Sequence, residues 1–274
     1  MTVDHYAVIG NPIAQSKSPL IHAAFAQAHA QALEYGRLLA EPDTFESTVR
    51  GFIATGGRGM NVTAPFKLQA FGLADDLSER ARQAGAVNAL SFEGGRILAD
   101  NFDGVGLVAD IQRNLGVALR GKRVLLLGAG GATRGALLPL LEQGPAQVAI
   151  ANRDRSRAAQ LVAELHPRGQ VITGGYPDFA KQTFDVVVNA TSASLRGELP
   201  PLASQIFAPG CLAYELAYGK GLTPFLRVAR DAGAGRLADG VGMLVEQAAE
   251  AFAWWRGVRP DTRVVIDRLT VPLE

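Results

Sequence analysis

The amino-acid sequence predicts an α/β protein made of two α/β domains, and three observations support this prediction. Short apolar segments that suit strands alternate with longer segments of helical periodicity along most of the chain. A glycine-rich turn at 128–131 follows a buried strand and precedes a helix, which begins a second series of this kind. From residue 241 the pattern changes to two consecutive helices. We therefore expect a smaller first domain at 1–103 completed by 241–274, and a doubly wound second domain at 104–240.

The first domain alternates strands with helices. Ser18 suits the N-cap of the first helix and Pro19 its first position, because a serine oxygen can accept an N–H bond there and proline needs no N–H partner. Gly94 and Gly95 suit the turn of a hairpin-like pair of strands. The expected strands are 6–10, 34–39, 59–63, 86–92 and 96–99, and the expected helices are 19–30, 43–54 and one that begins near Pro65.

The second domain begins with a helix at 104–115 and a loop at 116–121. Four consecutive apolar residues, Val124 to Leu127, suit a strand buried on both faces of a parallel sheet. Pro139 should kink the helix that follows the glycine turn. The expected strands are 124–127, 147–151, 171–173, 185–189 and 212–217, and the expected helices are 132–143, 156–165 and 223–232.

The last two helices have a different character. An apolar stripe of Leu244, Ala248, Ala251 and Trp255 predicts a long helix from residue 241, and a second helix is expected over 261–269. Two consecutive helices do not continue the alternation of a doubly wound domain. We therefore place them on the first domain, which makes that domain discontinuous.

Composition excludes several classes of function. The chain is 48% hydrophobic and 19% charged with a net charge of +1, which gives no reason to expect nucleic acid or a membrane surface as a partner. The sequence contains no apolar run of membrane-spanning length and begins without a secretory pattern, so we expect a cytoplasmic protein. The single cysteine, Cys211, lies in an apolar run and is expected in the core. The oligomeric state is left open, a homodimer included.

The glycine turn predicts a dinucleotide site. Gly128, Gly130 and Gly131 allow close approach of the backbone to a pyrophosphate, and the N–H groups at the start of the next helix would face the anion. The third glycine of the G-x-G-x-x-G pattern is replaced by Thr133. A glycine-rich structural turn is the alternative, but a strand before it and a helix after it favour a Rossmann-type nucleotide domain.

The end of the second strand of this domain indicates which nucleotide binds. An NAD-binding domain would place an acid there to hold the ribose 2′-hydroxyl. This chain has Asn152 and Arg153 instead, and Arg157 follows in the next helix. Guanidinium groups suit a 2′-phosphate, which predicts NADP. Asp154, directly after Arg153, keeps NAD open as the alternative.

Polar residues follow the strands of the first domain. Because ligands of open α/β sheets bind at the carboxyl ends of strands, hydroxyls, amides, a cation and a carboxylate should converge there on a small polyhydroxylated substrate. Each residue also has a structural alternative, such as a cap for Ser18 or Asp103, a turn for Asn88 and a solvated charge for Lys67. The residues concerned are Ser16, Ser18, Asn61, Thr63, Lys67, Asn88, Asn101 and Asp103.

Taken together, these motifs resemble the shikimate dehydrogenase family. The segment N-V-T-A-P-F-K at 61–67 is highly specific for that family, whereas the glycine turn alone is not. The resemblance runs in family order over nearly the whole chain. The matching segments are 10–19, 61–67, 86–89, 100–104, 128–135, 152–153, 189–192, 218–226 and 239–248.

The resemblance implies a two-domain oxidoreductase that reduces 3-dehydroshikimate to shikimate with NADPH, on the pathway to chorismate and the aromatic amino acids. It implies Lys67 and Asp103 as the catalytic pair and needs no metal, because the cation at the reacting oxygen is a side chain. The residues implied to hold the substrate are Ser16, Ser18, Asn61, Thr63, Lys67, Asn88, Asp103, Tyr218 and Gln247. Those implied to contact NADP are Gly128, Ala129, Gly130, Gly131, Ala132, Thr133, Asn152, Arg153, Arg157, Thr191, Leu216 and Gly240.

Three positions depart from the family pattern. Phe102 stands where Thr or Tyr is expected, Asp154 where Thr is usual, and Leu216 where Met is common. Asp154 keeps open a quinate/shikimate dehydrogenase that uses NAD or both cofactors. The methylenetetrahydrofolate dehydrogenases share a similar nucleotide domain, but the segment at 61–67 argues against them. A nucleotide-binding protein without activity would not need Lys67 and Asp103.

Overall fold

The protein is described by a computed structural model that covers residues 3–273, which divide into two compact units. Unit 1 runs to Gly106 and also contains Val245–Val265, and unit 2 contains Leu107–Leu244 and the chain from Ile266 onward. The sequence places all of 241–274 with the first domain. The residues from Ile266 instead group with unit 2, where Leu273 packs against the core.

Unit 1 contains a six-stranded sheet with the order β2-β1-β3-β5-β6-β4. Strand β1 is parallel to β2 and β3, and β5 is antiparallel to β3 and β6, which forms the expected hairpin. The strands are β1 (Asp4–Gly10), β2 (Leu33–Leu39), β3 (Gly57–Val62), β4 (Asp76–Leu77), β5 (Ala89–Glu93) and β6 (Arg96–Asp100).

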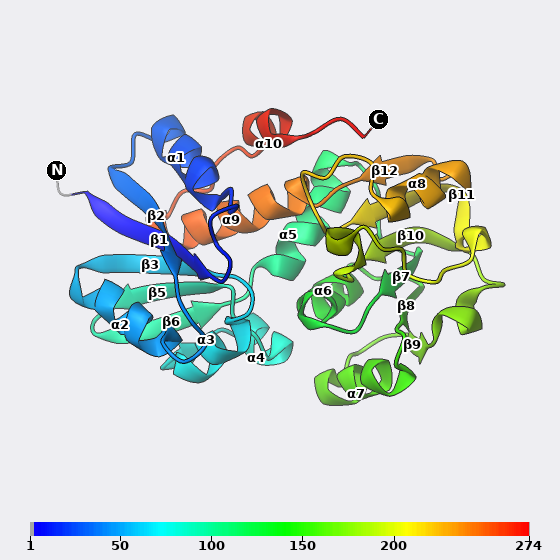
Figure 1. Ribbon diagram of the computed structural model, residues 1–274, viewed down its shortest axis with the longest axis horizontal. Coiled ribbons are helices and arrows are strands. Elements are labelled where there is room, and N and C mark those ends of the chain that lie inside the picture. The colour runs from blue at the N-terminus through cyan, green and yellow to red at the C-terminus, as the bar shows by residue number, and fades with distance from the viewer. Residues whose placement is uncertain (1–2, 274) are drawn as a thin grey trace. The chain divides into compact units, whose positions relative to one another are not determined.

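Helices cover both faces of this sheet (Figure 1). Successive residues of a strand point to opposite sides, so each strand contributes side chains to both faces. Ile9 packs on the face covered by α2 (Phe45–Ala54), α3 (Lys67–Leu73) and α4 (Glu79–Ala84). Tyr6 packs on the other face, where its ring lies 4.8 Å from that of Trp255. That face is covered by α1 (Ser18–Ala28) and α9 (Val241–Arg256), whose Phe25 and Phe252 rings meet at 5.7 Å.

Unit 2 contains six parallel strands in the order β12-β11-β10-β7-β8-β9, the order typical of a doubly wound dinucleotide domain. Val124 and Leu126 pack on one face of the sheet and Leu125 and Leu127 on the other, which confirms a strand buried on both sides. The strands are β7 (Arg123–Leu127), β8 (Gln147–Ala151), β9 (Val171–Gly174), β10 (Phe184–Asn189), β11 (Phe207–Glu215) and β12 (Arg236–Ala238).

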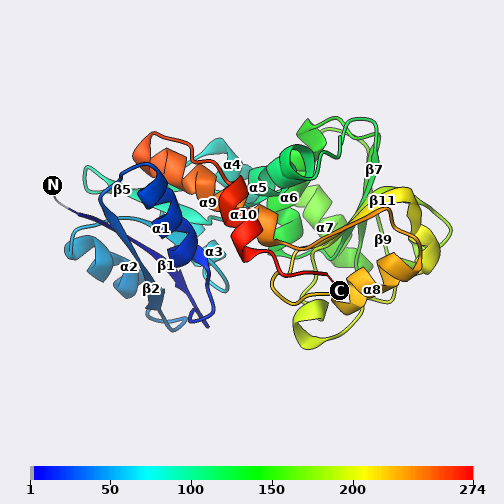
Figure 2. The same ribbon diagram turned by 90° about the horizontal axis from the view of Figure 1, so that it is seen from above.

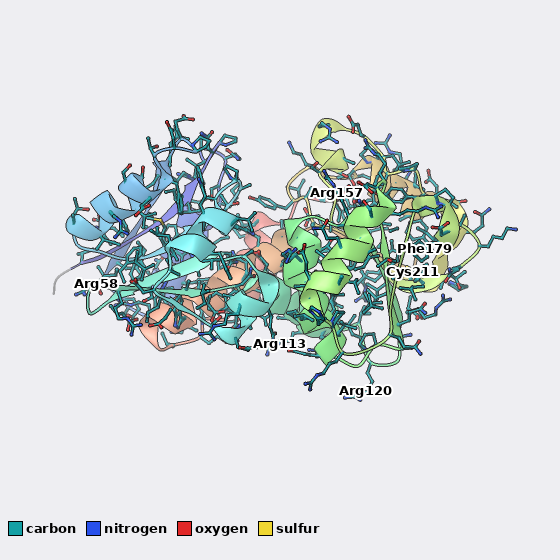
Figure 3. All side chains as sticks on the ribbon, turned by 90° about the horizontal axis from the view of Figure 1, so that it is seen from below. Arg58, Arg113, Arg120, Arg157, Phe179 and Cys211 are labelled. Atoms are coloured by element: carbon teal, nitrogen blue, oxygen red, sulfur yellow. The ribbon has the colours of Figure 1, made fainter. Side chains whose placement is uncertain are left out.

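Helices also cover both faces of the second sheet (Figure 2). One face packs against α6 (Gly131–Glu142), α7 (Arg155–Leu165) and the π-helical turn that follows α5 (Asp103–Ala109). The other packs against α8 (Pro224–Asp231) and the 3-10 turn Tyr176–Phe179. Cys211 and Phe179 belong to this core (Figure 3), where burial raises the pKa of the Cys211 thiol to about 12. Its prediction as a core residue is confirmed.

Several details differ from the sequence prediction. Ser18 is the first residue of α1 and not its cap, since Lys17 occupies the N-cap without a side-chain bond. Helix α3 begins at Lys67, after Pro65. Helix α6 runs from Gly131 to Glu142, one residue earlier at each end than expected, and contains Pro139 as the sequence predicts. Strands β4 and β12 and helix α4 were not predicted, because two, three and six residues are too short for a clear period.

The chain ends with α10 (Arg263–Leu269). Within residues 3–273, no helix combines the length and the apolar character that crossing a membrane requires.

Candidate active site

The strands of unit 1 bring the predicted polar residues to one edge of the sheet. Ile9 pairs with Val62, Asn61 with Ala89, and Ala89 with Asp100. The carboxyl ends of β1, β3 and β6 and the start of β5 therefore lie side by side. The residues after or before these ends include Ser16, Ser18, Thr63, Lys67, Asn88 and Asp103.

Lys67 and Asp103 form a close ion pair at this edge. Lys67 Nζ lies 2.5 Å from Asp103 Oδ2, and the two side chains are 30% and 10% exposed. Asn101 Oδ1 accepts a bond from the Asp103 backbone N–H at 3.1 Å, so Asn101 caps the turn that begins α5. The Asp103 carboxylate is thus left to bind Lys67, and its alternative role as a helix cap is taken by Asn101.

Asn88 connects the pair to the C-terminal helix α9. Its Nδ2 donates to Asp103 Oδ1 at 2.9 Å and to Gln247 Oε1 at 3.2 Å. Its Oδ1 accepts from the Phe102 N–H at 2.8 Å. Both amide hydrogens are therefore used inside the protein, and further hydrogen bonding at Asn88 is limited to acceptance at Oδ1. The return of α9 places Gln247 beside residues that lie more than 140 positions earlier.

Phe102 does not leave a gap in this network. Its side chain is buried with Ala89, Ala251 and Trp254, and the Arg80 guanidinium lies 5.2 Å from its ring centre. The hydrogen bond that a threonine or tyrosine would offer there is replaced by apolar packing and a cation–π contact.

Gly106 allows α5 to approach α9. A Cβ at Gly106 would lie 2.8 Å from Gln247 Cβ and 2.8 Å from its backbone nitrogen, closer than carbon atoms pack. We expect Gly106→Ala to destabilise the protein by about 1–3 kcal/mol, the cost of overpacking. Because Gln247 must shift and the sequence predicts it as a substrate ligand, we also expect weaker substrate binding. Denaturant unfolding and steady-state kinetics measure the two effects.

Gly51→Ala in α2 is the matched control. Nothing lies within 4 Å of a Cβ at Gly51, so the change should stabilise α2 by up to about 1 kcal/mol. A Gly106→Ala variant as stable as the Gly51→Ala variant would contradict the close contact between the two helices.

The loop after β1 carries the two serines. Ser16 Oγ donates to Ser18 Oγ at 3.3 Å, and the Arg37 guanidinium donates to the Ser16 carbonyl at 2.7 Å. Thr63 lies beside this loop, since a Cβ at Gly10 would be 2.5 Å from Thr63 Cγ2. The hydroxyls of 16, 18 and 63 therefore belong to one region of unit 1, as the sequence predicts.

The glycine turn of unit 2 has the shape expected of a pyrophosphate cradle. Gly128 follows β7 with φ +103°, a conformation that favours glycine, and a Cβ there would lie 3.1 Å from Thr191 Cγ2. Helix α6 begins at Gly131, so the N–H groups of its first turn have no partner within the helix. Thr133 is fully buried and its hydroxyl donates to the Gly128 carbonyl at 2.8 Å. Thr133 thus stabilises the turn where the common pattern has a third glycine.

The residues after β8 present cations to solvent. Arg153 is exposed, and the side chain of Arg157, which is 76% exposed, extends from α7 (Figure 3). Asp154 is the N-cap of α7, where its Oδ1 accepts from the Ser156 N–H at 2.9 Å and from the Ser156 hydroxyl at 2.6 Å. These bonds hold the pKa of Asp154 below its usual value. The Asp154 carboxylate thus caps helix α7.

A buried carboxylate joins the loops after β10 and β11. Glu215 Oε2 accepts from Asn189 Nδ2 at 3.0 Å, from Thr223 Oγ1 at 3.1 Å and from the Ser194 hydroxyl. Asn189 Oδ1 in turn accepts from the Thr191 N–H and hydroxyl at 3.2 and 2.7 Å. Glu215 therefore fixes the loop that carries Thr191.

Leu216 and Gly240 lie against each other. A Cβ at Gly240 would be 2.1 Å from the Leu216 carbonyl oxygen. Asp239, beside Gly240, accepts from the Gly219 and Val241 N–H groups at 3.0 and 3.1 Å. The sequence predicts Gly128, Thr191, Leu216 and Gly240 at the cofactor site. In the structure each of them follows the carboxyl end of a unit 2 strand.

Four residues of these networks are not predicted from the sequence. Tyr35 and His22 contact Asn61, and Asn189 and Glu215 organise the Thr191 loop. Glu215 was detectable as a lone acid at the end of an apolar strand, whereas His22 and Tyr35 carry no local pattern. Tyr218 belongs to unit 2, and burial raises its pKa. Among the described residues, no three His, Cys, Asp or Glu side chains are grouped to hold a metal.

Comparison with known proteins identifies the family. Residues 8–90 match the shikimate dehydrogenase substrate binding domain, 110–196 match shikimate/quinate 5-dehydrogenase, and 240–270 match the shikimate 5′-dehydrogenase C-terminal domain. The NADP(+) shikimate dehydrogenase of Nitrosospira multiformis is 56% identical over 97% of each chain.

Two solved structures are also similar. An Ael1 enzyme from Pseudomonas putida is 63% identical with a TM-score of 0.94, covering 99% of this chain and 100% of that one. The shikimate 5-dehydrogenase of Thermus thermophilus, solved with NADP(H) and shikimate, is 30% identical with a TM-score of 0.86 over 97% and 98% of the chains. With three matching domains and relatives above 50% identity over nearly its whole length, the chain belongs to the shikimate dehydrogenase family.

Proposed function

We propose that this protein catalyses the reversible, NADPH-dependent reduction of 3-dehydroshikimate to shikimate, a step of chorismate and aromatic amino-acid biosynthesis. The observation that carries the proposal is the Lys67–Asp103 ion pair, set among hydroxyl and amide groups at the strand ends of unit 1. A small polyhydroxylated substrate needs such groups for orientation, and carbonyl reduction needs a proton donor beside them.

Lys67 and Asp103 have distinct parts in this reaction. Bound NADPH supplies the hydride to the ring carbonyl. The Lys67 ammonium group stabilises the negative charge that develops on the carbonyl oxygen and donates the proton to it. Asp103 holds Lys67 Nζ through Oδ2 and binds a substrate hydroxyl. It also assists the relay that returns a proton to Lys67 after Lys67 has donated its own. Asn88 keeps Asp103 in place through Oδ1.

The remaining predicted residues bind and orient the two ligands. Ser16, Ser18 and Thr63 hold the substrate's carboxylate and hydroxyls, together with Asn61, Gln247 and Tyr218. The Gly128–Thr133 turn fits a pyrophosphate, because its positive-φ glycine and free helix N–H groups match the donor set that an anion requires. Arg153 and Arg157 would hold the 2′-phosphate of NADP, and Thr191, Leu216 and Gly240 would contact the cofactor.

A single assay tests the function. Purified protein is mixed with shikimate or quinate, each with NADP or NAD, and reduced cofactor is followed by absorbance. Shikimate with NADP should give the highest kcat/KM. Higher kcat/KM with quinate and NAD would instead identify a quinate/shikimate dehydrogenase. No turnover with either substrate would reject the proposed reaction.

Arg153→Ala tests the cofactor assignment. The change should raise KM for NADP by about 10- to 100-fold, because it removes charge-assisted bonds to the 2′-phosphate worth about 1.5–3 kcal/mol. KM for NAD should hardly change, since NAD has no such phosphate. Steady-state kinetics with both cofactors measure the ratio, and equal effects on both would contradict the clamp.

Two controls accompany this experiment. Arg155→Ala removes a neighbouring guanidinium that is paired with Asp178 at 2.8 Å, and should leave both KM values near wild type. Asp154→Asn preserves a capping side chain for α7 and removes the acid that favours a bare ribose. Much stronger use of NAD by the wild type than by Asp154→Asn would show that the acid sets a dual preference.

The location and the assembly of the enzyme are also part of the proposed function. We propose a cytoplasmic location, in keeping with the proposed role of the enzyme in a biosynthetic pathway. A homodimer is one assembly that the sequence leaves open, and sedimentation equilibrium distinguishes it from a monomer.

A further inference from the structure

The side-chain amide of Asn61 is held by three neighbours. Asn61 is 5% exposed and lies at the end of β3. Its Oδ1 accepts from the Tyr35 hydroxyl at 2.6 Å and lies 3.2 Å from His22 Nε2. Its Nδ2 donates to the Asn88 carbonyl at 3.3 Å. The orientation of the amide is therefore fixed from both sides.

These contacts leave Asn61 one kind of hydrogen bond. An amide oxygen has two lone pairs, and Tyr35 and His22 use both. The nitrogen has two hydrogens, of which the Asn88 carbonyl takes one. Within residues 3–273 the second N–H has no protein partner. Asn61 can therefore offer a ligand a donor but no acceptor, whereas Asn88 offers only an acceptor.

The surroundings of His22 show which ring nitrogen carries the hydrogen. His22 is 1% exposed, stacks on Tyr35 with ring centres 4.2 Å apart, and has Phe25 and Phe252 at its other sides. Burial lowers its pKa to about 3, so the imidazole is neutral. Because Asn61 Oδ1 is an acceptor, the hydrogen lies on Nε2 and donates to it. Nδ1 is then a buried acceptor without a hydrogen-bond partner among the described residues.

An unpartnered buried nitrogen costs free energy, and an aromatic hydrocarbon would fill this place without that cost. Phenylalanine at this position would remove that cost together with the Nε2–H bond to Asn61. What His22 provides is a single N–H directed at Asn61 Oδ1.

Tyr35 connects Asn61 to the serine loop. Its hydroxyl donates to Asn61 Oδ1 at 2.6 Å and lies near Ser18, whose hydroxyl accepts from Ser16 at 3.3 Å. Burial raises the pKa of Tyr35 well above its ordinary value, so its hydroxyl remains a donor throughout the working pH range. The hydroxyls of Ser16 and Ser18 therefore lie in the same region of unit 1 as the Tyr35–Asn61 bond.

We infer that Tyr35 and His22 are positioning residues that lock the Asn61 amide, so that its free N–H donates to a substrate oxygen acting as acceptor. The inference rests on the proposed function, in which Asn61 binds shikimate. A flipped amide would set its oxygen against the Asn88 carbonyl, which can only accept, would end donation by Tyr35 and His22 to Oδ1, and would present the wrong atom to the substrate.

Tyr35→Phe and His22→Phe test the inference. Each keeps an aromatic ring and removes one donor to Asn61 Oδ1. Each should raise KM for shikimate about three- to tenfold, the value of one neutral hydrogen bond, and leave kcat and KM for NADP within about twofold. His22→Phe should not lower the midpoint of denaturant unfolding, because it also removes the unpartnered Nδ1. A purely structural residue would move the midpoint and not KM.

Three further comparisons make the test specific. Tyr6→Phe is the matched control, since the Tyr6 hydroxyl bonds Arg256 at 3.4 Å and not Asn61, and it should keep KM for shikimate at the wild-type value. In an Asn61→Ala background, Tyr35→Phe should no longer change shikimate affinity, because a positioning residue acts only through its target. His22→Gln, which restores an N–H donor, should recover part of the lost affinity.

The outcomes are distinct. Wild-type KM for shikimate in both Tyr35→Phe and His22→Phe overturns the inference while the proposed function stands. A rise of the same size with and without Asn61 overturns it too. Wild-type protein that does not oxidise shikimate with NADP rejects the proposed function, and with it the inference.

Discussion

Lys67→Ala should lower kcat by a factor of about 10² to 10⁴, the range usual for loss of a general acid. The developing oxyanion would lose both its proton donor and its nearest positive charge. KM for shikimate should change only modestly, because hydroxyl and amide groups would still hold the substrate. The measurement is steady-state kinetics with shikimate and NADP at saturating cofactor.

The protein should remain folded in this variant. Lys67 is 30% exposed at the start of α3, and Asp103 keeps its bond to Asn88 at 2.9 Å. Lys181→Ala is the control, because Lys181 is an exposed lysine of unit 2 and should have wild-type kcat. Turnover near wild type in Lys67→Ala would remove Lys67 from the mechanism.

Glu215→Ala should have the largest effect on stability. The carboxylate accepts bonds from Asn189, Ser194 and Thr223, and the Ala217 N–H approaches Oε1 at 3.3 Å. Without the carboxylate, each of these buried donors lacks an acceptor, which costs about 1–3 kcal/mol per donor. Because local relaxation offsets part of this cost, we expect the free energy of unfolding to fall by about 3–5 kcal/mol. KM for NADP should rise as well, because the Thr191 loop is held through Asn189.

Denaturant unfolding followed by circular dichroism measures the stability. Glu142→Ala is the control, since Glu142 lies at the end of α6 outside this network and should change stability by less than about 0.5 kcal/mol. Equal stability of the two variants would show that the network around Glu215 contributes little.

The pH dependence of Glu215 has a defined sign. Burial raises the pKa of Glu215, and the bonds from Ser194 and its other donors oppose part of that rise. The folded protein therefore binds a proton at this site more tightly than the unfolded chain does. Stability contributed here falls as pH rises from the unfolded value, about 4.3, through the raised folded value. As pH rises through that window, the free energy of unfolding of wild type should fall relative to that of Glu215→Gln. On acidification through the same window it should rise relative to that variant.

Much of unit 2 was predictable because its pattern is local. Val124 to Leu127 are apolar without interruption, and glycine residues with a helix after them follow at once. Arg153 is two residues beyond the end of β8, so its place follows from the strand end. The doubly wound character of the sheet followed from the alternation of strands and helices, whereas the strand order comes from the structure. β12 was missed because three residues carry no period.

The substrate edge of unit 1 was less accessible to sequence reasoning. The sequence predicted polar groups at strand ends, but each had a structural alternative of its own. Only the pairing of β3, β5 and β6 decides that Asn61, Asn88 and Asp103 are neighbours. Asn101 then takes the capping role that the sequence left open for Asp103.

The sequence by itself determined the two α/β series, the glycine turn, the cations after β8 and the family, because each depends on residues close together in the chain. Tertiary structure alone decided the partners of the polar groups. Gln247 meets Asn88 across 159 positions, and His22 meets Asn61 across 39. Hydrogen bonds saturate and have direction, so which atom of Asn61 remains for a ligand depends on neighbours that only folding brings together.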